Sequence, residues 1–119
     1  MTPAELRALV AEVQRRKCEL DSVEVKQARG GTPKRLYEAM SAFANRPGGG
    51  VILFGVDESA NFAVTGVENI QRLQEEVSHL ATGDMEPLLR PWFSFEEIYS
   101  ETVAAVEMDD VKWRPYALP

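Results

Sequence analysis

Four acidic residues next to two β-rich segments have the types and positions that a divalent-metal site needs. Glu19 and Glu24 lie five residues apart, and Asp57 and Glu58 directly follow the apolar run 51–56. If the two segments are neighbouring strands, these acids converge at one edge of a sheet. Carboxylates around a groove can hold Mg²⁺ or Mn²⁺, which activates water and neutralises a phosphodiester oxygen. The spacing thus suggests Glu19, Glu24 and Asp57 as metal ligands, with Glu58 as a further catalytic acid, although nineteen acids in the chain make such pairs common.

Basic residues in the same region suggest contact with phosphates. Lys26, Lys34 and Arg35 lie close together around a predicted glycine turn, and Arg46 stands at the far end of the next predicted helix. Lys and Arg in such positions bind phosphates without reading sequence. Solvated surface residues are the alternative for all four. For Lys26 a salt bridge to Glu24 is a further alternative, since residues i and i+2 of a strand share a face.

The charge distribution is compatible with a basic face on an acidic molecule. The 119 residues include 13 Lys and Arg against 19 Asp and Glu, a net charge of −6. Residues 1–50 hold nine basic and six acidic residues, whereas residues 51–119 hold four and thirteen. This asymmetry argues against a wholly cationic nucleic-acid binder and leaves room for a local phosphate-binding face. A surface without a partner is the alternative.

Several other classes are excluded by composition. The single Cys18 cannot form an internal disulfide and fits a reducing, cytoplasmic compartment. One cysteine and one histidine are too few for a zinc site. No apolar run approaches the roughly 20 residues of a membrane span. The glycines 48–50 precede a strand and lack the Lys-Ser/Thr ending of a P-loop, so they indicate a tight turn with close backbone packing.

The hydrophobic pattern predicts a single α+β domain over residues 1–119, with helices packed against a mixed β-sheet. Thr2 and Glu5 form a capping box at the start of the first helix. The apolar run 51–56 predicts a central strand that is buried on both faces. The expected element order is αβαββαββ, with helices over 2–16, 33–44 and 69–83 and strands over 23–26, 51–56, 62–67, 92–99 and 102–108.

Together these segments resemble the Schlafen-type AlbA-like domain, also called the divergent-AAA or AlbA-2 DNA-binding domain. The resemblance rests on a combination of short motifs spread over residues 15–118. They are the segment Glu19 to Lys26, the string Ser41 to Asn45 followed by Gly49-Gly50, the run Ile52 to Glu58, Val64 to Val67, Arg90-Pro91 and Arg114 to Tyr116.

The resemblance implies two possible activities. Bacterial domains of this type form the N-terminal part of larger transcriptional regulators or helicase-related proteins. In the vertebrate branch, a related domain is an endoribonuclease that uses three acids, which match Glu19, Glu24 and either Asp57 or Glu58. This sequence departs from that pattern, because it has Asp57-Glu58 where Asp-Asp is usual and Val25 where an aromatic residue is usual.

From the sequence we therefore expect a nucleic-acid-binding module, with DNA preferred over RNA, at the N-terminus of a longer bacterial transcriptional regulator. The first alternative is an endoribonuclease that depends on Mg²⁺ or Mn²⁺; no other cofactor is expected. The second alternative is a protein-interaction or assembly module, which includes a homo-oligomer. No membrane partner is expected.

Overall fold

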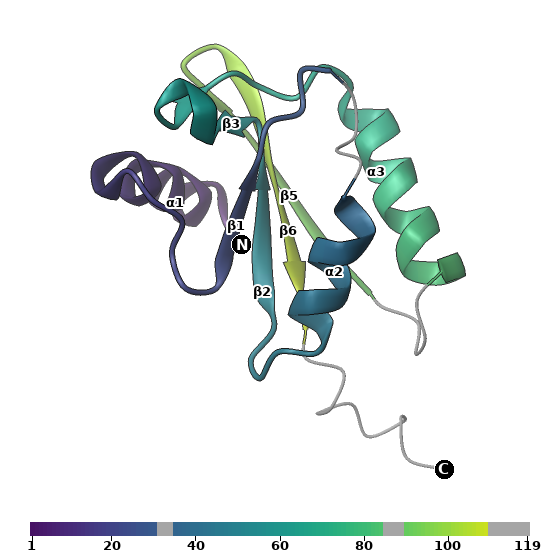
Figure 1. Cartoon of the computed structure of the whole chain (residues 1–119). Helices are drawn as coiled ribbons and strands as arrows, with labels where there is room; N and C mark the ends of the chain where they lie inside the picture. Colours follow the sequence, from purple (N-terminus) through teal and green to yellow (C-terminus); the bar gives the residue numbers. More distant parts are fainter. Residues whose placement is uncertain (31–34, 85–89, 110–119) are drawn as a thin grey trace.

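Helices cover both faces of a mixed β-sheet (Figure 1). The structure, a computed structural model, describes residues 1–30, 35–84 and 90–109. Its helices are α1 (Pro3–Arg16), α2 (Leu36–Ala44) and α3 (Ile70–His79), with a 3₁₀ turn at Glu58–Ala60 and a π-helical turn at Leu80–Asp84. Its strands are β1 (Val23–Lys26), β2 (Gly50–Phe54), β3 (Val56–Asp57), β4 (Ala63–Val64), β5 (Trp92–Ile98) and β6 (Glu101–Met108). The α+β class is confirmed.

The main sheet has the strand order β1-β2-β6-β5. Strands β1 and β2 are parallel, and the other two pairs are antiparallel. The parallel pair requires a crossover connection, which contains α2. Strand β2 lies inside the sheet, as its apolar sequence predicts, whereas β1 and β5 are the two edges.

Alternation along the strands divides the buried side chains between two cores. In β2, Ile52 packs beneath α2 and α3, whereas Leu53 packs with α1. Both valines of β1 are buried in the α1 core. The residues between and after them, Glu24 and Lys26, therefore lie on the α2 side of the sheet. This placement decides which face of the molecule carries the candidate site.

The predicted strand 51–56 is broken at Gly55. Its φ of 100° lies in the left-handed region, which glycine adopts readily. After this bend, Val56 pairs with Val64 in a separate two-stranded sheet. A Cβ on Gly55 would lie 3.1 Å from the carbonyl carbon of Gly66, so the two backbones approach closely there. The break adds one short strand to the predicted order, which becomes αβαβββαββ.

Two other predicted boundaries differ from the structure. The return strand expected over 62–67 covers only Ala63–Val64, because Phe62 has a φ of 60° and is not extended. The second helix begins at Leu36. Its predicted start at Thr32-Pro33 lies outside the described residues.

The first helix begins as predicted. The Thr2 N–H donates to the Glu5 carboxylate at 2.8 Å, and the Glu5 N–H donates to the Thr2 hydroxyl at 3.1 Å. The hydrogen bond from the Thr2 backbone N–H, followed by the contact with the Thr2 side chain, lowers the pKa of the Glu5 carboxyl. None of the helices in the described part of the chain combines the length and apolar character that a bilayer crossing requires.

The glycine run before β2 makes a tight turn with close packing, as predicted. Gly48 and Gly49 have φ values of 84° and 68°. A Cβ on Gly49 would overlap the carbonyl oxygen of Met108, and one on Gly50 would overlap the ring of Phe43. The absence of side chains at Gly49 and Gly50 thus lets the start of β2 pack closely against the Met108 backbone of β6 and against Phe43 of α2.

We expect Gly49→Ala to destabilise the domain more than Gly48→Ala. Each alanine should cost about 1–2 kcal/mol in the left-handed conformation. At Gly49 the added methyl also meets the Met108 backbone, whereas at Gly48 nothing lies within 4 Å. Urea unfolding of the two variants measures the difference, and equal losses would contradict the packing argument.

Candidate nucleic-acid interface

Glu19 caps the open edge of β1. Its Oε2 accepts the Val25 N–H at 2.5 Å. The carbonyls of Ser22 and Lys26 accept hydrogen bonds from the N–H groups of Val51 and Gly55, on the β2 side of the strand. Backbone groups of successive strand residues point to opposite sides, so the N–H of Val25, next to Lys26, points away from β2. Among the described residues, Glu19 is the partner of this N–H. The same contact places the Glu19 carboxylate at the edge strand that contains Glu24.

Glu24 and Lys26 form an ion pair. The Lys26 Nζ lies 3.5 Å from Glu24 Oε1, and both side chains are about one-quarter to one-third exposed, at 22% and 34%. The predicted salt bridge between residues i and i+2 is confirmed. Its length and partial exposure are typical of a weak pair, which a competing anion can open at low cost.

The acids after β2 also have local roles. Asp57 caps the 3₁₀ turn, because its Oδ1 accepts the Ser59 N–H at 3.0 Å and the Ser59 hydroxyl at 2.7 Å. Glu58 is exposed in that turn. Within residues 1–30, 35–84 and 90–109, no three Asp, Glu, His or Cys side chains form a group that could hold a metal ion. The structure thus brings Glu19 and Glu24 to one strand edge without assembling a three-carboxylate cage.

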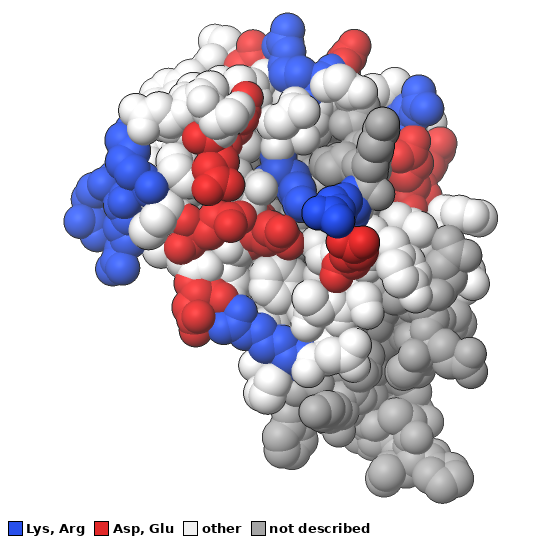
Figure 2. All heavy atoms as spheres, in the orientation of Figure 1, with Lys and Arg blue, Asp and Glu red and all other residues white. Residues whose placement is uncertain are grey.

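Two of the predicted basic residues, Lys26 and Arg46, lie in β1 or bond to the loop before it. Arg46 Nη2 lies 2.8 Å from Asp21 Oδ2, and its Nη1 donates to the Asp21 carbonyl, which ties the end of α2 to the loop before β1. Arg35 precedes α2 and pairs with Glu38 at 3.4 Å. Lys34 lies outside the described residues. Figure 2 shows red and blue side chains interleaved over β1 and α2, so each cation here has an acidic neighbour.

A basic group at the end of α1 was missed by the sequence analysis. Arg15 and Arg16 both bond to Glu12, and their side chains are 67% and 54% exposed. These bonds, that of Arg15 first, lower the pKa of Glu12. Lys17 follows and donates to the Asn61 carbonyl at 3.3 Å. In Figure 2 blue side chains gather over α1 at the left. The three consecutive basic residues Arg15, Arg16 and Lys17 at the end of the predicted first helix could have indicated this group from the sequence.

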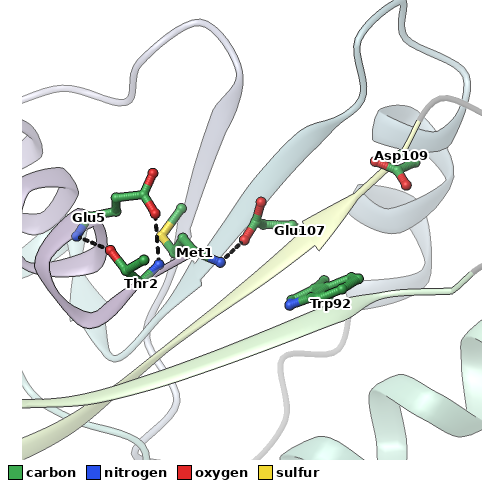
Figure 3. Close-up of a pocket in the computed structure, with 6 residues that line it drawn as sticks. All are labelled: Met1, Thr2, Glu5, Trp92, Glu107 and Asp109. Carbon is green, nitrogen blue, oxygen red and sulfur yellow. Dashed lines mark hydrogen bonds and ion pairs between the residues drawn. The ribbon is translucent and has the colours of Figure 1, made fainter.

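A pocket on the other face of the sheet is acidic. It has a volume of about 330 Å³ and is lined by Met1, Thr2, Glu5, Trp92, Glu107 and Asp109 (Figure 3). The Met1 ammonium donates to Ser94 Oγ at 3.0 Å and also bonds to Glu107. Carboxylates would repel a phosphate, so the pocket does not extend the candidate interface.

One comparison with known proteins identifies the domain family, and another finds solved structures with a similar fold. A family model described as "Schlafen, AlbA_2" matches residues 19–118. The N-terminal domain of a Nitrosomonas europaea protein related to the ATP-dependent DNA helicase RecG has a similar structure, with a TM-score of 0.70 and 24% identity over 92% of this chain and 77% of that one. The DIP2311 protein of Corynebacterium diphtheriae also has a similar structure, with a TM-score of 0.57. Its sequence is 18% identical, and the match covers 90% of this chain and 26% of that one. A search of curated proteins gave no significant match.

Glu19→Ala should destabilise the domain in the absence of any metal ion. Loss of a hydrogen bond from a backbone N–H to a charged acceptor at this partly exposed edge should cost about 1 kcal/mol. Glu58→Ala is the matched control: none of the described residues forms a hydrogen bond or ion pair with this exposed carboxylate, so its effect should stay within about 0.5 kcal/mol. Urea unfolding in EDTA compares the two, and wild-type stability of Glu19→Ala would refute the capping role.

Proposed function

Since the chain belongs to the Schlafen AlbA_2 family, we propose that it is a nucleic-acid-binding module, specifically the DNA-binding N-terminal module of a longer, cytoplasmic bacterial transcriptional regulator. The observation that carries this proposal is the family match over residues 19–118, which contains β1 and the basic residues around it. The similarity to a domain from a RecG-related protein adds a neighbour whose description involves DNA, although at 24% identity it supports the fold alone.

The geometry supports binding by exchange of acidic partners. Lys26, Arg35 and Arg46 each face a carboxylate across 2.8–3.5 Å. Exposed pairs of this kind contribute only about 0–1 kcal/mol. A phosphate that replaces the carboxylate forms a comparable contact and also releases counterions from the nucleic acid. Phosphate binding therefore does not require the cations to be free beforehand.

Binding should be weak, depend little on sequence and fall steeply with salt. Fluorescence anisotropy with a labelled DNA duplex and an RNA hairpin measures this dependence. Lys26→Ala and Arg46→Ala should each flatten the plot of log affinity against log salt by about 0.9. Arg72→Ala is the matched control, because this exposed arginine of α3 also pairs with an acid, Glu76, at 2.8 Å. It should leave the slope unchanged.

Two results would refute the binding proposal. One is the absence of any binding at low salt. The other is unchanged affinity after replacement of Lys26, Lys34, Arg35 and Arg46 together by alanine.

A second candidate function is a divalent-metal-dependent endoribonuclease. It is favoured by one observation, the hydrogen bond that holds the Glu19 carboxylate against the strand containing Glu24. Glu19, Glu24 and Asp57 have the oxygen donors that Mg²⁺ and Mn²⁺ prefer, with Glu58 as a further acid. The described geometry does not gather three of these carboxylates into one group.

The variant Glu24→Gln separates the two functions, because it should increase nucleic-acid affinity in a binding module and abolish cleavage in a nuclease. For a binding module, removal of the charge beside Lys26 should tighten nucleic-acid binding by about 2–5-fold, the equivalent of a weak exposed pair. For a nuclease, the same variant should abolish cleavage of structured RNA in Mn²⁺ or Mg²⁺. Circular dichroism confirms that the variant folds. Unchanged affinity together with no cleavage by the wild type would remove Glu24 from both functions.

A further inference from the structure

Strand β5 is a sheet edge with a defined set of outward-facing backbone groups. Ile98 pairs with Glu101 across a two-residue turn, in which Tyr99 and Ser100 both have positive φ, as in a type I′ hairpin. In such a hairpin the residues next to the turn exchange hydrogen bonds, and every second residue along the strand then faces β6. The backbone groups of the intervening residues point outward; within β5 these residues are Phe93, Phe95 and Glu97.

One end of this edge is already closed. The Glu97 N–H donates to Glu96 Oε1 at 2.9 Å, and the Glu97 carbonyl accepts Arg7 Nη2 at 2.8 Å. At the other end, Pro91 has no N–H to offer. Between these ends, none of the described residues forms a hydrogen bond with the outward N–H or carbonyl of Phe93 or Phe95. As far as the described residues go, Phe93 and Phe95 are therefore open for strand pairing.

The side chains of this open segment are apolar. The rings of Phe93 and Phe95 stack with centroids 6.1 Å apart, on the sheet face that α2 and α3 cover. Phe95 is 36% exposed and Trp92 is 70% exposed. Edge strand β1 differs, because it is short and charged and Glu19 caps its outward N–H. An apolar, uncapped edge is a pairing surface that folded proteins otherwise protect.

We infer that β5 pairs with β5 of a second copy of this chain, antiparallel about a two-fold axis at Ser94. In this register Phe93 exchanges both backbone hydrogen bonds with Phe95 of the partner subunit, and the symmetric pair does the same. Pro91 falls opposite Glu97 of the partner subunit, so the residue without an N–H meets the residue whose carbonyl is already bonded. The ladder uses the two open residues and ends where both strands are closed.

The same register is favourable for the side chains. Paired residues of antiparallel strands share a face, so the two stacked phenylalanine pairs form one cluster of four rings. On the opposite face, Ser94 lies at the axis, and its hydroxyl is already bonded to Met1 of its own chain. Glu96 is paired with Arg7 at 3.2 Å. No like charges stand directly opposite each other along the ladder.

The dimer should be weak and should respond to salt in the opposite direction from nucleic-acid binding. A single short ladder covers less than the roughly 1,600 Å² of a standard interface. Each copy carries a net charge of −6, so the copies repel one another and added salt screens that repulsion. Failure of nucleic-acid binding and failure of self-association are thus separate results.

Sedimentation equilibrium over a range of protein concentrations tests this proposal. The wild type should reach twice its monomer mass, and Phe95→Lys should weaken association at least about tenfold, because a lysine on an edge opposes pairing. Tyr37→Lys is the control, since Tyr37 is a comparably exposed aromatic residue of α2, at 45%. It should associate like the wild type. In wild-type protein, amide exchange at Phe93 and Phe95 should slow as concentration rises, while exchange at Glu97 stays constant.

Four outcomes would overturn the inference. A monomer at NMR concentrations with rapidly exchanging Phe93 and Phe95 amides would show that the edge is left open. A monomer in which those amides are protected would show that another segment of this chain covers the edge. A dimer that Phe95→Lys leaves intact, or one without protection of the two amides, would place the interface elsewhere.

Discussion

The candidate interface depends on how a four-residue edge strand is held in place. β1 has one neighbour, β2, and its register sets Glu24 beside Ile52 and Lys26 beside Phe54. On its outer side, the carboxylate of Glu19 supplies the partner that a further strand would otherwise provide. Because two valines anchor β1 in the α1 core, its polar residues remain on the α2 side. The positions of the acids and of Lys26 follow from these constraints.

Local patterns predicted much of this arrangement. The Thr2–Glu5 capping box and the Glu24–Lys26 ion pair depend on residues a few positions apart, so the chain encodes them directly. The bend at Gly55 was missed, because a glycine inside an apolar run is compatible with a continuous strand until the close approach of another backbone is known. The carboxylate positions are harder still, since side-chain distances between separate segments depend on tertiary packing. Spacing therefore suggested three converging acids, whereas each of Glu19, Glu24 and Asp57 has its own local partner.

The two edge strands of the sheet differ in how their outward backbone groups are satisfied. Strand β1 is short and carries charged side chains, and the Glu19 side chain caps its outward N–H. The candidate phosphate contacts lie beside it. At β5 the described residues close the end near the hairpin, through Arg7 and Glu96. An eight-stranded sheet built through β5 would keep β1 at both of its ends. Nucleic-acid contact and self-association would then use opposite margins of the domain without competing for residues.

The capping contacts of Glu19 and Asp57 bear on how such domains diverge. Each carboxylate holds a piece of backbone, whether or not it has a second role in chemistry. A lineage that abandoned metal-dependent cleavage would still be selected to keep both acids, because their replacement costs stability. Such a pair of acids would then persist with the architecture after the reaction had been lost. Ancestry of the fold and retention of the activity are separate traits. Their separation would become visible at an acid such as Glu58, whose carboxylate has no hydrogen bond or ion pair with the described residues.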